Sequence, residues 1–392
     1  MTRRTLYSLC LATFTLFLFS MTTMAQTSAP TPPPLEATTY ILIDASTGKV
    51  LAENNADQQV PPASLTKMMT DYVVASELKR GTIHLDDQVH ISTNAWWMKR
   101  GRDSSEMFVA VNSDVPLSDL LHGMIIQSGN DASIALAEHV AGTEDAFADL
   151  MNKKAAELGM THSSFKNPTG WPDPQHYTTA HDLSTLARAM IRDYPEQYSI
   201  YSQKEFTWNN IRQENRNLLL KRDSTVDGIK TGHTNEAGYC LVASAKRGDT
   251  RLISVVMGTK SEEARATESE KLLTFGFHAY QTQKVYAAGK VLQQAPVWSG
   301  AAKQVDIGVK NEVVVTIPRG DQDKLKAEVA VNKIIKAPIM EGDVLGTLSI
   351  KLDGQEILNQ PITAMMAVPE GGIITRIWDG LRLFFMKLFG GL

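Results

Sequence analysis

Runs of β-type residues lie on both sides of a long helical middle, and this order constrains the fold more than any other feature. Residues 40–55 alternate apolar and polar side chains around a Thr47-Gly48 turn, which predicts a hairpin. Residues 226–258 hold a glycine-punctuated strand and two longer β-type runs, which predicts an antiparallel meander. Because helical patterns fill the chain between them, we expect an α+β arrangement with one mainly antiparallel sheet flanked by helices.

The helical segments are marked by apolar periodicity and by their end signals. A helix is predicted from Ser64 to about Leu78, after a Pro-Pro pair that breaks a preceding strand, and another over 145–159. Residues 118–142 hold two apolar runs of helical period with Ser-Gly-Asn between them. This triplet is therefore expected on a short connection, and a last helix over 263–280 follows the meander.

The chain changes character at about residue 283, where helical patterns stop. Five short β-type runs follow, with turn residues between them, at 305–309, 312–318, 326–331, 344–352 and 362–368. This spacing predicts a small all-β domain, a sandwich, over 283–370, after a main domain over 38–282. The all-β part has no cluster of His, Cys, Ser or paired acidic residues, so we interpret it as a spacer.

The N-terminal end has the pattern of a secretory signal peptide over 1–25, with two arginines, an uncharged apolar run over 6–20 and small residues at 23–25. A membrane-spanning anchor is the alternative, but a span needs about 20 apolar residues and this run is shorter. A Pro- and Thr-rich flexible leader is expected over 26–37. The pattern therefore predicts an exported protein.

Composition and cysteine content narrow the class of protein. The formal net charge of −4 does not provide the basic surface expected of a nucleic-acid binder. Of the two cysteines, Cys10 would leave with the signal peptide, so no intramolecular disulfide is expected. Cys240 is then a small buried strand residue or, alternatively, a reactive thiol.

The last segment, 371–392, is rich in Ile, Leu, Phe and Trp and predicts an amphipathic helix. Arg376 and Lys387 fall on one narrow face, and apolar residues such as Trp378 and Phe385 fill the rest. Such a helix suits a membrane interface, whereas a helix docked on the protein core is the alternative and four charges disfavour a span. We therefore expect a membrane-anchoring helix.

A serine and a lysine three residues apart, Ser64 and Lys67, form the first candidate for chemistry. On a helix this spacing places both side chains on one face, and serine needs a base to become a nucleophile. Lysine can act as that base only when it is neutral, so burial or nearby positive charge must lower its pKa. The pattern alone says little, because it recurs in the sequence at Ser46/Lys49, Ser76/Lys79 and Ser163/Lys166.

Two further triplets follow Ser64 in the order that such a site needs, namely Ser128-Gly129-Asn130 and Lys230-Thr231-Gly232. A second cation lowers the pKa of a neighbouring lysine and attracts an anionic substrate. We therefore expect the charge of Lys230 to favour the neutral form of Lys67. His233 offers a Ser–His pair as an alternative, but we interpret it as a strand residue that follows the triplet. The sequence contains no His-Glu-x-x-His pattern, and neither a metal nor a cofactor is expected.

These three motifs, in this order and spacing, resemble those of the penicillin-recognising serine enzymes. The stretches 167–183, 215–220 and 226–239 narrow the resemblance to the low-molecular-mass D-alanyl-D-alanine carboxypeptidases of the penicillin-binding protein 5/6 type. It covers almost all of the chain after the signal peptide, including the all-β domain and the tail. It implies a β-lactamase/transpeptidase-like serine D,D-peptidase domain over 38–282.

The resemblance also implies a role for each matching residue. Ser64 attacks the D-Ala-D-Ala bond and forms an acyl-enzyme, with Lys67 as general base. Ser128 relays a proton towards the leaving amine, and Asn130 holds the substrate amide and Lys67. The remaining residues serve the substrate carboxylate and the oxyanion: Lys230, Thr231, Gly232, His233, Arg216 and Arg265.

The implied function is removal of the terminal D-alanine from peptidoglycan pentapeptide stems, with β-lactams as covalent inhibitors. The implied location is the periplasmic face of the bacterial inner membrane, held peripherally by the C-terminal helix. Two alternatives stay open at this point. One is a serine β-lactamase, which must deacylate penicillin quickly, and the other is a weakly active wall-associated scaffold that binds β-lactams.

Overall fold

The computed structural model of the chain describes residues 30–96, 98 and 104–389. The predicted signal peptide lies outside these residues, as do the first part of the predicted leader and the last three residues of the tail.

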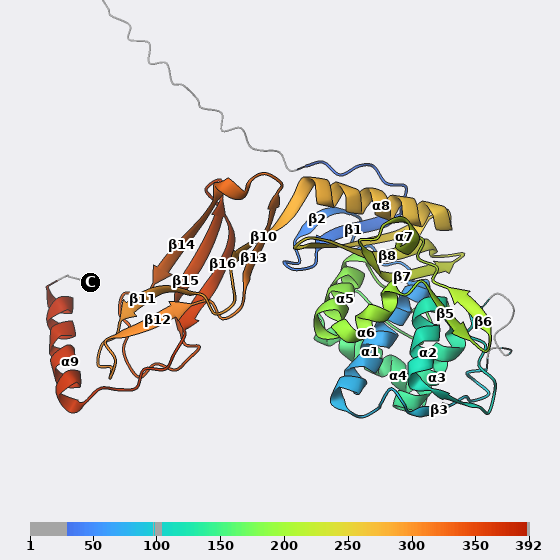
Figure 1. Ribbon diagram of the computed structural model, residues 1–392, viewed down its shortest axis with the longest axis horizontal. Helices are drawn as coiled ribbons and strands as arrows, with labels where there is room; N and C mark the ends of the chain where they lie inside the picture. Colours follow the sequence, from blue (N-terminus) through green and yellow to red (C-terminus); the bar gives the residue numbers. More distant parts are fainter. Residues whose placement is uncertain (1–29, 97, 99–103, 390–392) are drawn as a thin grey trace, which may run out of the picture. The chain divides into compact units, whose positions relative to one another are not determined.

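A five-stranded antiparallel sheet forms the centre of the main domain, in the order β2-β1-β9-β8-β7 (Figure 1). The strands are β1 (Thr39–Asp44), β2 (Val50–Asn54), β7 (Val226–Thr234), β8 (Gly238–Arg247) and β9 (Thr250–Thr259). β1 and β2 are the predicted hairpin, and β7 to β9 are the predicted meander. The two meet because β1 pairs with β9, where Leu42 lies opposite Ser254.

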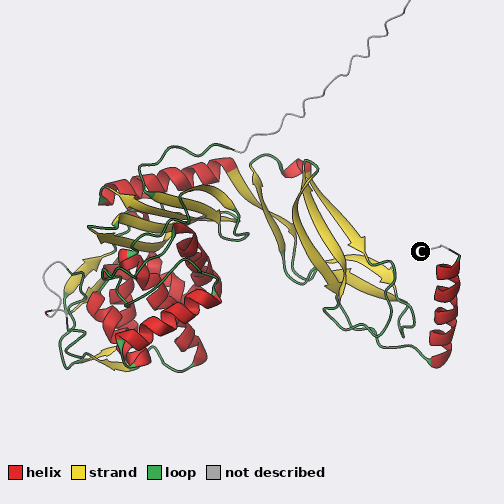
Figure 2. Ribbon diagram, turned by 180° about the vertical axis from the view of Figure 1, so that it is seen from behind, coloured by secondary structure: helices red, strands yellow, loops and turns green. Residues whose placement is uncertain are grey.

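Helices cover both faces of this sheet, as the sequence predicts (Figures 1 and 2). They are α1 (Lys67–Arg80), α2 (Leu117–His122), α3 (Asn130–Ala141), α4 (Glu144–Glu157), α5 (Ala180–Asp193), α6 (Pro195–Tyr198), α7 (Leu219–Arg222) and α8 (Glu262–Ala279). α8 packs on one face and shares a core with residues such as Leu42 and Val256. α5 packs on the other face, where α1 and α3 complete a larger core around Ile41 and Val255.

Two small hairpins lie outside the main sheet. They are β3 (Gln88–His90) with β4 (Asp114–Pro116), and β5 (Glu205–Trp208) with β6 (Ile211–Glu214).

Cys240 lies on β8, where it is fully buried, and burial raises the pKa of its thiol to about 11. Of the two interpretations of this cysteine, the buried strand residue is therefore correct.

The C-terminal domain is all-β, as predicted, and consists of a five-stranded and a two-stranded sheet around one core. The strands are β10 (Tyr280–Tyr286), β11 (Val291–Pro296), β12 (Gln304–Gly308), β13 (Val313–Pro318), β14 (Leu325–Val331), β15 (Val344–Leu352) and β16 (Gln355–Ala364). The strand predicted over 362–368 is wrong in its position, since β16 ends at Ala364. Polar residues and Pro361 hide the first part of β16, because proline is rare inside strands.

The last helix, α9 (Ile373–Leu388), leaves its large apolar side chains exposed. Trp378 is 64% exposed and Ile374 is 85% exposed, so this helix does not bury its apolar face in a protein core. Among the described residues, no helix is both long and apolar enough to cross a membrane.

Ser64 lies on a short 3₁₀ turn, Ala63–Thr66, and α1 begins only at Lys67. The helix predicted from Ser64 therefore starts three residues late. The strand before the prolines, β2, already ends at Asn54, and Val60 makes only an isolated bridge with Thr178. The loop at Gly170 presses on this turn. A Cβ atom on Gly170 would lie 1.8 Å from the carbonyl oxygen of Ala63, and the φ of Gly170 is +84°.

We expect Gly170→Ala to lower the free energy of unfolding by about 3 kcal/mol or more, because it combines a left-handed alanine with a backbone clash beside Ser64. Chemical denaturation followed by circular dichroism measures the change. Gly81→Ala is the matched control, since its φ is +72° and nothing lies within 4 Å of the added Cβ. This control should lose only about 1 kcal/mol, and equal losses in the two variants would contradict the prediction.

Candidate active site

Ser64 opens into a cleft of about 480 Å³ between the main sheet and the helical middle. Asn130, Thr169, Trp171 and His233 line the same cleft. These residues come from four separate parts of the chain: the turn before α1, the start of α3, the loop after α4, and β7. The fold therefore brings the three predicted motifs to one place.

Lys67 is 1% exposed, and its Nζ lies among three oxygen atoms. It is 3.0 Å from Ser64 Oγ, 2.7 Å from Asn130 Oδ1 and 2.8 Å from the carbonyl oxygen of Thr169. The predicted spacing of Ser64 and Lys67 thus places the two side chains in direct contact, even though the turn between them is 3₁₀ in part.

Burial lowers the pKa of Lys67 to about 7, against the opposing charge of Glu106, and Arg216 adds to the lowering. From the sequence we expected burial or a nearby cation to lower this pKa, with Lys230 as the cation. Burial is the main cause, and Arg216 is the cation that contributes. Near pH 7 a substantial fraction of Lys67 is therefore the free amine that general-base chemistry requires.

The three neighbours of Nζ fix what a neutral Lys67 can do. A neutral amine has two N–H donors and one lone pair, and the oxygens of Asn130 and Thr169 can only accept. When both donors point to these oxygens, the lone pair faces the hydroxyl of Ser64. The arrangement therefore prepares Lys67 to remove the proton of Ser64.

Asn130 is itself held in one orientation. Its Nδ2 donates to Ser104 Oγ at 2.7 Å and its backbone N–H donates to the carbonyl oxygen of Ser105 at 2.7 Å. These contacts aim Oδ1 at Lys67, as the resemblance implies for this residue.

Ser128 is 2% exposed, and its Oγ has no hydrogen-bond partner in the described part of the chain. It lies in the left-handed region at φ 68°, between a π-helical turn (Gly123–Gln127) and α3. The short connection predicted for this triplet is therefore present. A buried hydroxyl without a partner is costly, so it is available to a substrate group.

The Lys230-Thr231-Gly232 triplet lies on β7, against the turn that carries Ser64. A Cβ atom on Gly232 would lie 3.2 Å from the backbone nitrogen of Leu65, so a glycine allows this close approach. Lys230 is 2% exposed. Burial, with the charges of Lys67, Arg216 and Arg265, holds the pKa of Lys230 well below its usual range.

The other predicted residues differ in their exposure. Arg216 is exposed, whereas Arg265 on α8 is 2% exposed and donates to the carbonyl oxygen of Gly232 at 3.3 Å. His233 stacks on Tyr239, with ring centroids 3.9 Å apart. This stacking holds the imidazole on β8 and agrees with its interpretation as a strand residue.

The sequence did not single out several residues of this site. Thr169 contributes only its carbonyl oxygen, which any residue possesses, although the Pro-Thr-Gly turn marks the loop. Asn167 Oδ1 accepts three backbone N–H groups of this loop, from Thr169, Gly170 and Trp171. Glu106 and Ser104 lie in a stretch without a motif.

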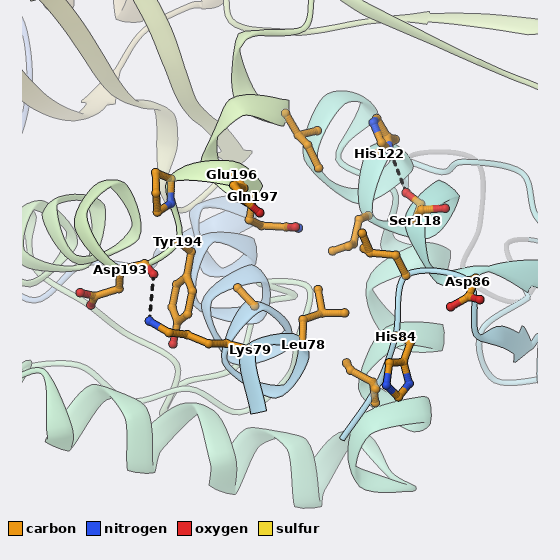
Figure 3. A pocket seen from close by; sticks show the side chains of 16 residues that line it. Leu78, Lys79, His84, Asp86, Ser118, His122, Asp193, Tyr194, Glu196 and Gln197 are labelled. Atoms are coloured by element: carbon orange, nitrogen blue, oxygen red, sulfur yellow. Dashed lines mark hydrogen bonds between the residues drawn. The ribbon is translucent and has the colours of Figure 1, made fainter. Parts of the chain in front are cut away.

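A second, larger cavity of about 770 Å³ lies elsewhere, lined by the end of α1, by α2 and by residues 193–200 (Figure 3). Lys79, which lies beside Tyr194 in this lining, donates to the carbonyl oxygen of Asp193 at 3.5 Å (Figure 3). No predicted site residue lines this cavity, so its size alone does not make it the reactive centre.

Comparisons with known proteins agree with this geometry. The family model described as D-alanyl-D-alanine carboxypeptidase matches residues 25–261, and that of the penicillin-binding protein 5 C-terminal domain matches 280–370. D-alanyl-D-alanine carboxypeptidase DacC of Escherichia coli (strain K12) is 45% identical over 379 residues, which cover 96% of this chain and 95% of DacC.

Two solved structures extend the comparison. Penicillin binding protein 5 from Haemophilus influenzae is 44% identical with a TM-score of 0.83, and the match covers 87% of this chain and 99% of that chain. Penicillin-binding protein D2 from Listeria monocytogenes, in the ampicillin-bound form, is 29% identical with a TM-score of 0.57, and covers 62% of this chain and 100% of that chain.

The acylation rate of Ser64 should rise with pH, because only the free amine of Lys67 can take the proton. With a pKa of about 7, we expect the rate constant for a fluorescent penicillin to be half-maximal near pH 7. It should fall to roughly one tenth at pH 6. Stopped-flow fluorescence gives the rate constants, and circular dichroism at each pH checks that the protein stays folded. A rate constant that does not change between pH 6 and 8 would contradict this role of Lys67.

Proposed function

This chain belongs to the D-alanyl-D-alanine carboxypeptidase family of serine peptidases, and on that premise we propose how its own residues release D-alanine from peptidoglycan pentapeptide stems. The observation that carries the proposal is the contact of Lys67 Nζ with Ser64 Oγ at 3.0 Å, in a buried site. A serine hydroxyl beside a neutral amine is an activated nucleophile.

In the first step Ser64 Oγ attacks the carbonyl carbon of the D-Ala-D-Ala bond while Lys67 takes the hydroxyl proton. The carbonyl oxygen becomes an oxyanion, and the backbone N–H groups of Ser64 and His233 are the proposed donors to it. Both residues line the same cleft, which supports this pairing. The C–N bond then breaks, and an ester on Ser64 remains.

The departing amine needs a proton, and Ser128 is proposed to deliver it. Its buried Oγ has no protein partner among the described residues, so no competing hydrogen bond must be broken. Lys67, now an ammonium, supplies the proton that Ser128 passes on. Water then attacks the ester with Lys67 again as base, which returns Ser64 to its starting state and releases the shortened stem.

The substrate carries a free carboxylate, and the cations around β7 are proposed to recognise it. A substrate carboxylate beside Lys230 would favour its ammonium form despite burial, and Thr231 offers a hydroxyl on the same strand. Arg216, being exposed, can reach a ligand directly, whereas Arg265 is buried and supports the strand through Gly232. A carboxylate among these groups gains charge-assisted hydrogen bonds.

The same first step applies to β-lactams, whose strained amide replaces the D-Ala-D-Ala bond. The ampicillin-bound form of the Listeria relative supports binding of β-lactams by this chain, and we propose that they acylate Ser64. A β-lactamase would share this acylation but release the acyl group quickly, and a weakly active scaffold would release no D-alanine. The rates of D-alanine release and of β-lactam hydrolysis therefore distinguish the carboxypeptidase, the β-lactamase and the scaffold.

We expect Ser64→Ala to abolish both covalent labelling by penicillin and D-alanine release from a pentapeptide ending in D-Ala-D-Ala, by about 10³-fold or more. Mass spectrometry of the labelled protein identifies the acylated residue, and a coupled assay measures D-alanine. Ser76→Ala is the matched control, since this serine belongs to another Ser-x-x-Lys pair far along α1. Label on another residue, or D-alanine release that persists in Ser64→Ala, would refute the mechanism.

We also propose that α9 anchors the exported protein to the periplasmic face of the inner membrane. Its exposed apolar side chains, including Ile374, Trp378 and Phe385, have no protein core to cover them. Arg376, Arg382 and Lys387 add positive charge that anionic lipid headgroups attract. A helix that lies in the interface needs no spanning length.

Deletion of residues 373–392 should release the protein from lipid vesicles without a change in peptide cleavage. Co-sedimentation with anionic vesicles measures binding. The double variant Trp378→Ser, Phe385→Ser keeps the length and charge of the helix, and it should bind at least about tenfold more weakly, because two large apolar side chains no longer enter the interface. Unchanged binding of the deletion variant would exclude the anchor.

A further inference from the structure

Glu236 lies in the reactive cleft, but the mechanism above gives it no role. It lines the cleft beside His233 and Thr234, and its side chain is exposed. Its carboxylate makes no ion pair and no hydrogen bond within the described part of the chain. Of the described residues that line the cleft, Glu236 is the only one with a formal charge at neutral pH, because desolvation and the charge of Arg265 hold the pKa of His233 below its usual range.

The turn between β7 and β8 fixes the place of this carboxylate. Thr234 Oγ1 accepts the backbone N–H of Ala237 at 3.0 Å, and Ala237 is buried. Thr234 also lies opposite Gly238 in the ladder that joins the two strands. Glu236 is therefore held at the end of the strand that carries the Lys230-Thr231-Gly232 triplet.

The position of β7 in the sheet indicates how a peptide can approach Glu236. Among the described strands, β7 pairs only with β8, so its other edge can pair with an extended peptide along the cleft. In the proposed mechanism the terminal carboxylate of the substrate lies at Lys230 and Thr231, and the reacting carbonyl lies at the backbone N–H of His233. The residue before D-Ala-D-Ala then comes beside Thr234, and a long side chain on it extends towards Glu236.

The charges along this line change sign. The positive charges of Arg216 and Arg265 act on Lys230, at the end where the substrate carboxylate binds. Glu236 is negative and stands at the other end. Glu262, the other carboxylate that acts on His233, lies 3.4 Å from Nη2 of Arg265 and is thus already paired. A peptide with a carboxylate at its end and an ammonium group a few residues before it complements this pattern.

We propose that Glu236 is a specificity-determining residue that binds the side-chain ammonium of the stem residue before D-Ala-D-Ala. A stem that can still accept a cross-link carries a free amine on that side chain, and cross-linking converts this amine to a neutral amide. The enzyme therefore favours stems whose amine is free. This inference rests on the proposed function and names the substrate class of the same site.

The test compares two synthetic peptides, Nα-acetyl-L-Lys-D-Ala-D-Ala with a free side-chain amine and the same peptide with that amine acetylated. The ratio of their kcat/KM values for D-alanine release measures the preference for the amine. We expect this ratio to fall about threefold in Glu236→Gln, the effect of one exposed ion pair, and about threefold further in Glu236→Lys. A merely structural role of Glu236 would change both kcat/KM values equally and would not move the ratio.

Two further variants and a change of salt complete the test. Glu236→Asp keeps the charge and should keep a ratio above that of Glu236→Gln. Glu196→Gln is the matched control, because Glu196 is an exposed carboxylate in the lining of the second cavity, and it should leave the ratio unchanged. In about 0.5 M sodium chloride the ratio of the unmodified protein should approach that of Glu236→Gln, because salt screens exposed charges.

The results separate this inference from the proposed function. If neither peptide releases D-alanine, the proposed function fails, and the role of Glu236 fails with it. If both peptides are cleaved and the ratio stays the same in Glu236→Gln and Glu236→Lys, the role of Glu236 is overturned and the proposed function stands.

Discussion

The placement of Lys67 Nζ among three oxygen atoms is the constraint on which the catalytic domain depends. Two of these oxygens can only accept, so the neutral amine directs its lone pair at Ser64. Removing such an amine from water is unfavourable for its charged form, and this cost, rather than a neighbouring cation, makes the base available. The site thus depends first on exclusion of solvent and only then on the pattern of charge.

The surrounding elements exclude water from Lys67 Nζ and hold its three oxygen neighbours in place. α1 carries Lys67 inside the larger core, α3 begins at Asn130, and the loop after α4 brings the carbonyl of Thr169. Gly170 and Gly232 let two backbones approach the turn of Ser64 more closely than a side chain would permit. Small residues at these contacts are therefore as necessary as the reactive ones.

The sequence predicted those features that depend on side-chain type and spacing. The hairpin, the meander and the motif residues Ser64, Lys67 and Asn130 follow from periodicity and from the chemistry of an activated serine. It could not predict Thr169, because a backbone carbonyl has no signature in the sequence. Glu236 was missed for a related reason, since one glutamate outside a motif gains its meaning only from the cleft that it lines. The position of β16 was wrong because Pro361 and polar residues obscured a real strand.

The pairing of β1 with β9 has a consequence for the order in which the molecule can assemble. Leu42 on β1 lies opposite Ser254 on β9, so this pair of strands can form only after a further 200 or more residues have been synthesised. Such distant pairing carries a high loop-closure entropy and folds slowly compared with local contacts. One edge of β1 pairs locally with β2, but its other edge stays unpaired while the chain is incomplete, so the sheet cannot close until the strand that borders the reactive cleft has also been made. Reactivity at Ser64 is thus a late property of the chain, gained only when both ends of the domain have met.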